Sequence, residues 1–236
     1  LEAGDVSSAA REFSTAYEAG EGDGAFYLGR LFELGLGADK DEMRAANLYA
    51  AGAKAGSTRS KARLGLIYHE GRVLLRDYAE GTKLLCEAAD AGDSDGQLNC
   101  GLAYKAGRGV PVDAQKAQDY LMKAAAQENI AALNVLGRHY LDQGEQAKAT
   151  ETFKTAADKG NALGMYEYAR LLAAPEVNDV VGAYAYANLA VVRGLRDAAA
   201  FRDGLETKMS PDDIAAGQEQ AKAWTAAQIE KNKAKS

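Results

Sequence analysis

The side chains best suited to chemistry are few and widely separated in this chain of 236 residues. Its two histidines, His69 and His139, have no His-Glu-x-x-His neighbours of a zinc protease, and neither a Gly-x-Ser-x-Gly elbow nor a Gly-Lys-Ser/Thr phosphate loop is present. Asp93 and Asp95 have part of the spacing of a calcium loop, but its bidentate glutamate is missing. We therefore predict no catalytic residue, no metal and no cofactor, with both histidines on the surface or in a groove.

Cys86 and Cys100 are the only cysteines. Two cysteines without Cys-x-x-Cys spacing make neither a disulfide framework nor a zinc or redox motif. Both lie seven residues from Asp93, on opposite arms of an expected helical hairpin and so at similar height. The simpler interpretation is two small core residues, and a disulfide is the alternative.

Charge and hydropathy exclude two classes of partner. Lys and Arg number 28 against 34 Asp and Glu, a net charge of −6, and the basic residues are scattered along the chain. Nucleic-acid binding calls for a basic footprint, which is missing. No apolar run approaches the roughly 18 residues of a membrane span. The chain begins at Leu1 and not at methionine, which fits a removed leader and leaves the compartment open between periplasm or cell envelope and cytoplasm.

Helices must position these side chains, and the pattern that predicts the helices repeats every 36 residues. Gly29, Gly65, Gly101 and Gly137 follow this spacing, each with a small residue five before it and an aromatic residue three after it. Offsets of three to five share one side of a helix. We interpret these glycines as the points where the two helices of a hairpin cross closely. The glycine six residues further on, as in Gly35, suits a left-handed residue that ends the helix.

A second helix follows at the same period, and the fourth copy has lost four residues from its inner loop. We predict a single all-α repeat domain over 1–236, a right-handed superhelix of helical hairpins, because single hairpins cannot bury both faces. Its expected parts are a half-repeat at 1–20, repeats at 21–56, 57–92, 93–127, 128–160 and 161–194, and a cap and tail at 195–236.

The expected cap begins a helix at Ser210-Pro211, with serine as N-cap and proline at the first helical position. Trp224, the only tryptophan, is expected to pack against the last hairpin. The lysine-rich end, 230–236, is expected to fray.

The combined motif resembles the Sel-one-like repeat (SLR) family, relatives of the tetratricopeptide repeats. Residues 96–127 carry it most fully, and 183–224 resemble the ending of many bacterial members. Cys100 departs from the pattern where leucine is usual, and Ala169 where glycine is usual. The resemblance implies a bacterial adaptor, scaffold or regulator, in many members exported to the periplasm. Some members resemble immunity proteins that neutralise phospholipase toxins.

By analogy with tetratricopeptide repeats, a partner would bind in a concave groove lined by the first helix of each repeat. The lining positions lie three before, one after, four after and five after the repeat glycine. They comprise Phe26, Arg30, Glu33, Leu66, His69, Leu102, Lys105, Asn134, Arg138, Asp142, Tyr166 and Arg170. Mixed arginine, acidic, aromatic and leucine side chains suit a protein or an extended peptide. The leading hypothesis is a non-enzymatic interaction module, and the alternatives are an immunity-type inhibitor of a toxin enzyme or a hydrolase.

Overall fold

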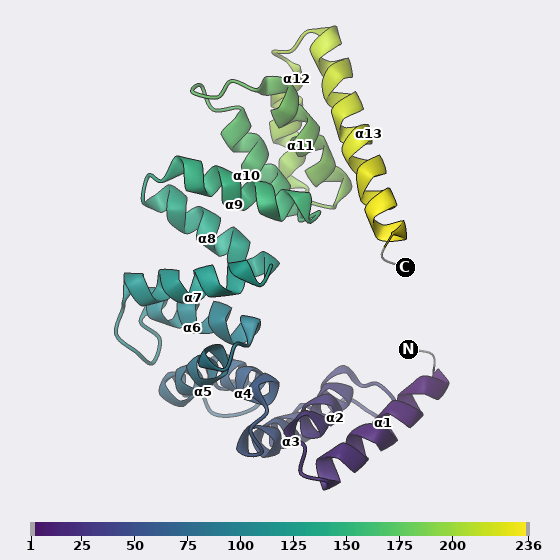
Figure 1. Ribbon diagram of the computed structural model, residues 1–236, viewed down its shortest axis with the longest axis vertical. Helices are drawn as coiled ribbons and strands as arrows, with labels where there is room; N and C mark the ends of the chain where they lie inside the picture. Colours follow the sequence, from purple (N-terminus) through teal and green to yellow (C-terminus); the bar gives the residue numbers. More distant parts are fainter. Residues whose placement is uncertain (1–2, 235–236) are drawn as a thin grey trace. The chain divides into compact units, whose positions relative to one another are not determined.

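The computed structural model describes residues 3–234, which form α-helices connected by turns and loops (Figure 1). The helices are α1 Ala3–Glu18, α2 Gly22–Leu34, α3 Glu42–Lys54, α4 Thr58–Glu70, α5 Tyr78–Asp90, α6 Ser94–Ala106, α7 Ala114–Ala126, α8 Ile130–Asp142, α9 Gln146–Asp158, α10 Ala162–Leu172, α11 Val180–Val192, α12 Asp197–Glu206 and α13 Pro211–Lys233. They divide into two compact units, one ending at Asn129 and one beginning at Ile130. The prediction of an all-α solenoid of hairpins is confirmed, while its treatment as a single domain stays a prediction.

The first unit holds the half-repeat α1 and the hairpins α2/α3, α4/α5 and α6/α7. We call α2, α4, α6, α8 and α10 the first helices, and α3, α5, α7, α9 and α11 the second helices. The three second helices of this unit start behind an aspartate, Asp41, Asp77 or Asp113, whose side chain accepts a hydrogen bond from the backbone N–H three residues on. The repeated cap explains why each second helix begins at the same point of the period.

The repeat glycines mark close helix crossings, as predicted. A Cβ on Gly29 would lie 2.6 Å from the ring of Tyr49, and one on Gly137 would lie 2.7 Å from the ring of Phe153. Both rings are fully buried. The glycine lets the second helix place a large side chain directly on the first helix, which offsets its cost of about 1 kcal/mol in helix propensity. Gly35 ends α2 with a φ of 68°, again as predicted.

The second unit begins with the shortened hairpin α8/α9. Its inner loop is 143–145, whereas the three earlier hairpins have loops at 35–41, 71–77 and 107–113, so the predicted loss of four residues is confirmed. Helices α10 and α11 form the last hairpin, and α11 packs against both α12 and α13.

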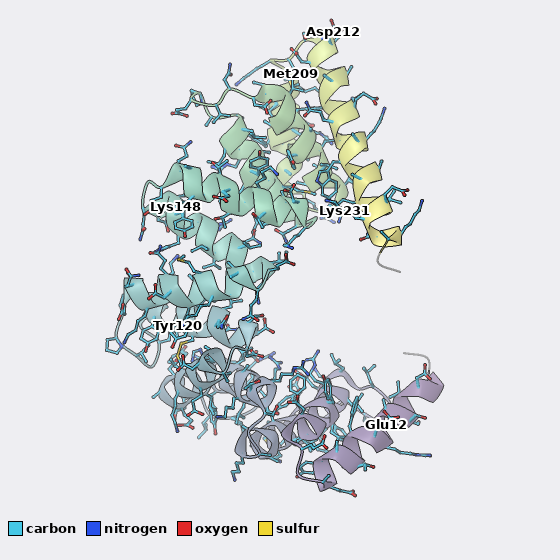
Figure 2. All side chains as sticks on the ribbon, in the orientation of Figure 1. Glu12, Tyr120, Lys148, Met209, Asp212 and Lys231 are labelled. Carbon is cyan, nitrogen blue, oxygen red and sulfur yellow. A yellow bond between two sulfur atoms is a disulfide. The ribbon has the colours of Figure 1, made fainter. Side chains whose placement is uncertain are left out.

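The C-terminal cap differs from the prediction in two respects. It contains two helices, because α12 precedes the helix that starts after Ser210. The second difference concerns the lysine-rich end at 230–236, which was predicted to fray but is helical as far as Lys233. Residues 235–236 lie outside the described part. Asp212 stands in the first turn of α13 and Lys231 in its last turn (Figure 2), where each charge complements the helix dipole. Trp224 packs on a core to which α9, α10, α11, α12 and α13 contribute, which agrees with the predicted packing against the last hairpin.

Cys86 and Cys100 form a disulfide between α5 and α6, drawn as a yellow bond in Figure 2. The simpler interpretation of two free core cysteines was therefore wrong, although Cys100 is fully buried, against Leu85 and Ala89. The bond links the second helix of one repeat to the first helix of the next. It ties together the interface on which a stack of repeats depends.

Candidate functional site

A depression of about 590 Å³ lies on the first helices of the first unit. Apolar and charged side chains both line it, and the lining residues are Phe26, Tyr27, Arg30, Arg59, Ala62, Arg63, Leu66, Asp93 and Asp95. We call it the unit 1 pocket. Of the predicted groove residues it brings together Phe26, Arg30 and Leu66. Leu66 also touches the core around the disulfide, so it serves packing as well as the surface.

Beside the unit 1 pocket, three side chains converge on one carboxylate, which we call the Glu33 cluster. Arg30 donates to Glu33 at 2.7 Å, the hydroxyl of Tyr49 donates at 2.6 Å, and Arg63 donates from Nε at 2.8 Å and from its terminal nitrogen. The Glu33 side chain is 14% exposed. Glu33 was predicted to face a partner, but it lies beneath the arginines and holds them in place.

The electrostatics of the Glu33 cluster favour the ionised carboxylate. Burial alone raises the pKa of Glu33, but the hydrogen bonds from Arg63 and its neighbours outweigh burial and lower the pKa to about 2. Burial, followed by the hydrogen bond to Glu33, raises the pKa of the Tyr49 hydroxyl. The cluster is therefore charged and fully formed at neutral pH.

The aromatic side of the unit 1 pocket is also fixed by contacts. The Tyr27 ring stacks on Phe13 of α1 at 4.8 Å between centroids, and Arg59 lies over Tyr27 and donates to its hydroxyl. Arg59 is 3.7 Å from Asp23, and its side chain is 49% exposed. Aromatic and guanidinium groups of this kind supply most of the energy at protein interfaces.

A second carboxylate holds two arginines in the second unit, and we call it the Glu167 cluster. Arg138 of α8 donates to Glu167 at 2.9 Å, and Arg170 donates to its other oxygen at 3.1 Å. The Glu167 side chain is 7% exposed, whereas each arginine side chain is 55% exposed. Arg138 and Arg170 were both predicted to line the groove, and their common buried partner Glu167 was missed.

One position explains three of the residues that the sequence argument missed. Tyr27, Arg63 and Glu167 each lie two residues before the repeat glycine or its equivalent. The position two before the glycine lies three residues from the position one after it, so side chains at these two positions share one side of the first helix. The same periodicity, extended by this offset, would have found all three.

His139 is buried and does not lie on the surface or in a groove as predicted, whereas His69 is partly exposed. His69 packs against the second helix α5, with Nε2 2.9 Å from the hydroxyl of Thr82 and its ring edge-on to Tyr78. His139 is only 8% exposed, and its Nε2 lies 3.0 Å from the side-chain nitrogen of Gln143. Neither ring lines the unit 1 pocket.

The remaining predicted groove residues are distributed over both units. Asn134 donates to Asn161 of the next first helix at 3.0 Å, which links neighbouring repeats. The Tyr166 ring lies beneath Arg170, at 5.8 Å, and edge-on to Phe201. Leu102 is half-buried, and Lys105 and Asp142 are exposed. Their use by a partner stays a prediction.

Within residues 3–234, no group of three or more His, Cys, Asp or Glu side chains has an arrangement that could hold a metal ion. A search of the same residues found no helix with both the length and the apolar character of a membrane span.

Comparison with known proteins agrees with this architecture. Residues 22–57, 58–93 and 94–129 match the Sel1 repeat in three consecutive copies. A Sel1 repeat protein from Oxalobacter formigenes superposes with a TM-score of 0.73 at 20% identity, over 90% of this chain and 96% of that protein. A protective antigen of uropathogenic Escherichia coli strains, described as having an SLR fold, superposes with a TM-score of 0.66 at 20% identity. That match covers 91% of this chain and 55% of the antigen.

Among curated proteins, the alginate biosynthesis protein AlgK of Azotobacter vinelandii is 30% identical over 115 residues. The match covers 47% of this chain and only 25% of AlgK, so about half of this chain corresponds to a quarter of that relative. Residues 22–129 therefore consist of three Sel1 repeats, and the fold is shared with a solved Sel1 repeat protein over most of the chain. Repeats of this family mediate protein–protein interaction and are generally non-catalytic.

Proposed function

We propose that this protein is a non-enzymatic interaction module that binds another protein, or an extended peptide, along its first helices. The unit 1 pocket carries the proposal, because it combines apolar side chains with partly exposed arginines on two consecutive first helices, α2 and α4. A partner side chain placed on Phe26 and Leu66 would bury apolar area while its polar neighbours reach Arg30 and Arg59. Such mixed surfaces are typical of protein interfaces, whose cores are rich in aromatic residues and arginine.

A matched pair of charge reversals tests this proposal. Arg59→Glu changes the rim of the unit 1 pocket, and Lys83→Glu is the control on the second helix α5, where Lys83 pairs with Glu80 and is 61% exposed. Proteins captured from an extract of the native organism are identified by quantitative mass spectrometry. We expect Lys83→Glu to capture the same partner as the wild type and Arg59→Glu to lose at least nine-tenths of it. Equal capture by both variants would contradict a site at this pocket.

We place the protein in the bacterial periplasm or cell envelope. The disulfide between Cys86 and Cys100 supports this location, because structural disulfides persist in oxidising compartments and are rare in the cytosol. Alkylation of free thiols in freshly lysed cells, followed by mass spectrometry of the peptides containing Cys86 and Cys100, tests it. Alkylation of both cysteines before reduction would argue for the cytoplasm.

The alternative of an immunity-type inhibitor, which covers the active site of a toxin enzyme such as a phospholipase, stays a prediction. It differs from a general scaffold in one measurable way. An inhibitor abolishes the activity of the enzyme that it captures, so an activity assay on the captured partner separates the two roles.

A further inference from the structure

The Glu167 cluster has more positive charge than its own carboxylate can neutralise. Two guanidinium groups meet one carboxylate, which leaves one net positive charge on a protein whose overall charge is −6. A purely structural ion pair needs only one arginine. The second arginine therefore asks for a different explanation.

Both arginines keep donors for a ligand. A guanidinium has five N–H donors, and Arg138 and Arg170 are each seen to give one to Glu167. Each side chain is about half exposed, whereas Glu167 is almost completely buried. Glu167 thus orients two guanidinium groups from neighbouring first helices, which reduces the conformational entropy that binding would otherwise cost.

An aromatic surface adjoins the arginines. Arg170 lies over the Tyr166 ring, and the edge of that ring contacts Phe201 of α12 at 5.7 Å between centroids. Both rings are only partly buried. A ligand that reaches the arginines would therefore also meet an apolar surface on one side.

We propose that the Glu167 cluster binds an acidic side chain of the partner protein, an aspartate or glutamate, between Arg138 and Arg170. An aromatic or aliphatic residue next to that acid in the partner sequence would pack on Tyr166 and Phe201. Arginine favours carboxylates because its planar fork matches their two oxygens. This inference rests on the proposed function and names the chemistry of the partner segment.

The test starts with a selection of random peptides displayed on phage against the complete wild-type chain. Selected peptides are synthesised in two forms, as found and with each Asp or Glu replaced by its amide. Their Kd values are measured against three forms of the protein. The first is the wild type. The second is the neutralised variant Arg138→Gln, Glu167→Gln, Arg170→Gln, in which no buried charge loses its partners. The third is the control Lys148→Gln, Lys154→Gln, Asp158→Asn on α9, which removes the same number of charges of each sign.

We expect the selected peptides to be enriched in Asp or Glu beside an aromatic or aliphatic residue. Replacement of the acid by its amide, and the neutralised variant, should each raise Kd by at least about tenfold. The control variant should change Kd by less than about twofold, and circular dichroism should show all three proteins folded. Affinity should also fall as the salt concentration rises, because the pair is only half-buried.

Two results would overturn the inference in distinguishable ways. If peptides bind without an acidic residue, or bind the neutralised variant equally well, the proposal of an acidic partner side chain is contradicted. The proposal of an interaction module is not affected by that result. If no peptide binds the native chain better than the heat-unfolded chain, and no native partner is captured through the unit 1 pocket, the proposed function falls as well.

Discussion

Reduction of the disulfide between Cys86 and Cys100 should destabilise the first unit and leave the second unit unchanged. The two cysteines are separated by 14 residues, and a disulfide that closes a loop of this length contributes about 3 kcal/mol by constraining the unfolded chain. Cys100 can stay packed against Leu85 and Ala89 after reduction, so loss of the constraint is the main expected cost. For a unit of this size, 3 kcal/mol corresponds to a fall in Tm of roughly 10 °C.

Hydrogen exchange with mass spectrometry resolves where the stability is lost. With reductant, amides of α5 and α6 should exchange faster, whereas those of α8 and α9 should keep their rates, because repeats interact only with their neighbours. The variant Cys86→Ala, Cys100→Ala is the control, since reductant should not change its Tm. An unchanged Tm of the reduced wild type, with both thiols proven free by alkylation, would refute the argument. Equal loss of protection in both units would refute its local part.

Four further changes test other parts of the structure. Acid should destabilise the first unit as the pH falls from 4.5 towards 2, because the lowered pKa of Glu33 gives stability that is present above the unfolded pKa and is lost when Glu33 is protonated. Solvent screening limits this loss of stability to about 1–2 kcal/mol. The variant Glu33→Gln should remove this pH dependence from the urea midpoint. Burial lowers the pKa of His69, so its contribution should be lost as the pH falls below about 6.5, and urea midpoints between pH 7 and 5 should show a slope that His69→Gln reduces. Gly137→Val should cost about 2–3 kcal/mol by overpacking a buried ring, whereas Gly204→Ala, which has open space around it, should not destabilise the chain in thermal melts. Deletion of 195–236 should expose the apolar face of α11 and promote aggregation, which light scattering measures. An unchanged thermal melt of this variant would contradict the assignment of 195–236 as the cap.

The sequence was sufficient for the repeat because its spacing reflects close packing. Gly137 can only be glycine where Phe153 lies on the first helix, and such a constraint recurs in the first four hairpins, at Gly29, Gly65, Gly101 and Gly137. The loss of four residues from the inner loop of the fourth hairpin could be predicted as well, because the residues on either side of that loop keep the spacing of the repeat. Ser210 was predictable as an N-cap because capping depends on a few adjacent residues.

What the sequence left open depends on contacts between residues that no local pattern connects. Cys86 and Cys100 have a suitable height on their helices, but a disulfide also needs the two Cβ atoms to approach across the interface between repeats. The helix α12 has neither a side-chain N-cap nor the repeat spacing, so no local sequence pattern predicted it. His139 looked like a surface residue because its type is usually polar and exposed, yet it is buried in α8.

The two arginine clusters show why charges on first helices cannot all be taken as binding groups. Stacking of repeats brings the position after one glycine close to the position two before the next, as Arg138 and Glu167 demonstrate. In the first unit, Arg30 and Arg63 occupy these same two positions, and Glu33 lies between their like charges. Charges at these offsets therefore connect one repeat to the next before they serve any partner. At Glu167 the excess of charge remains partly exposed and is therefore available for recognition. The test of that cluster must for this reason neutralise the buried carboxylate together with the arginines.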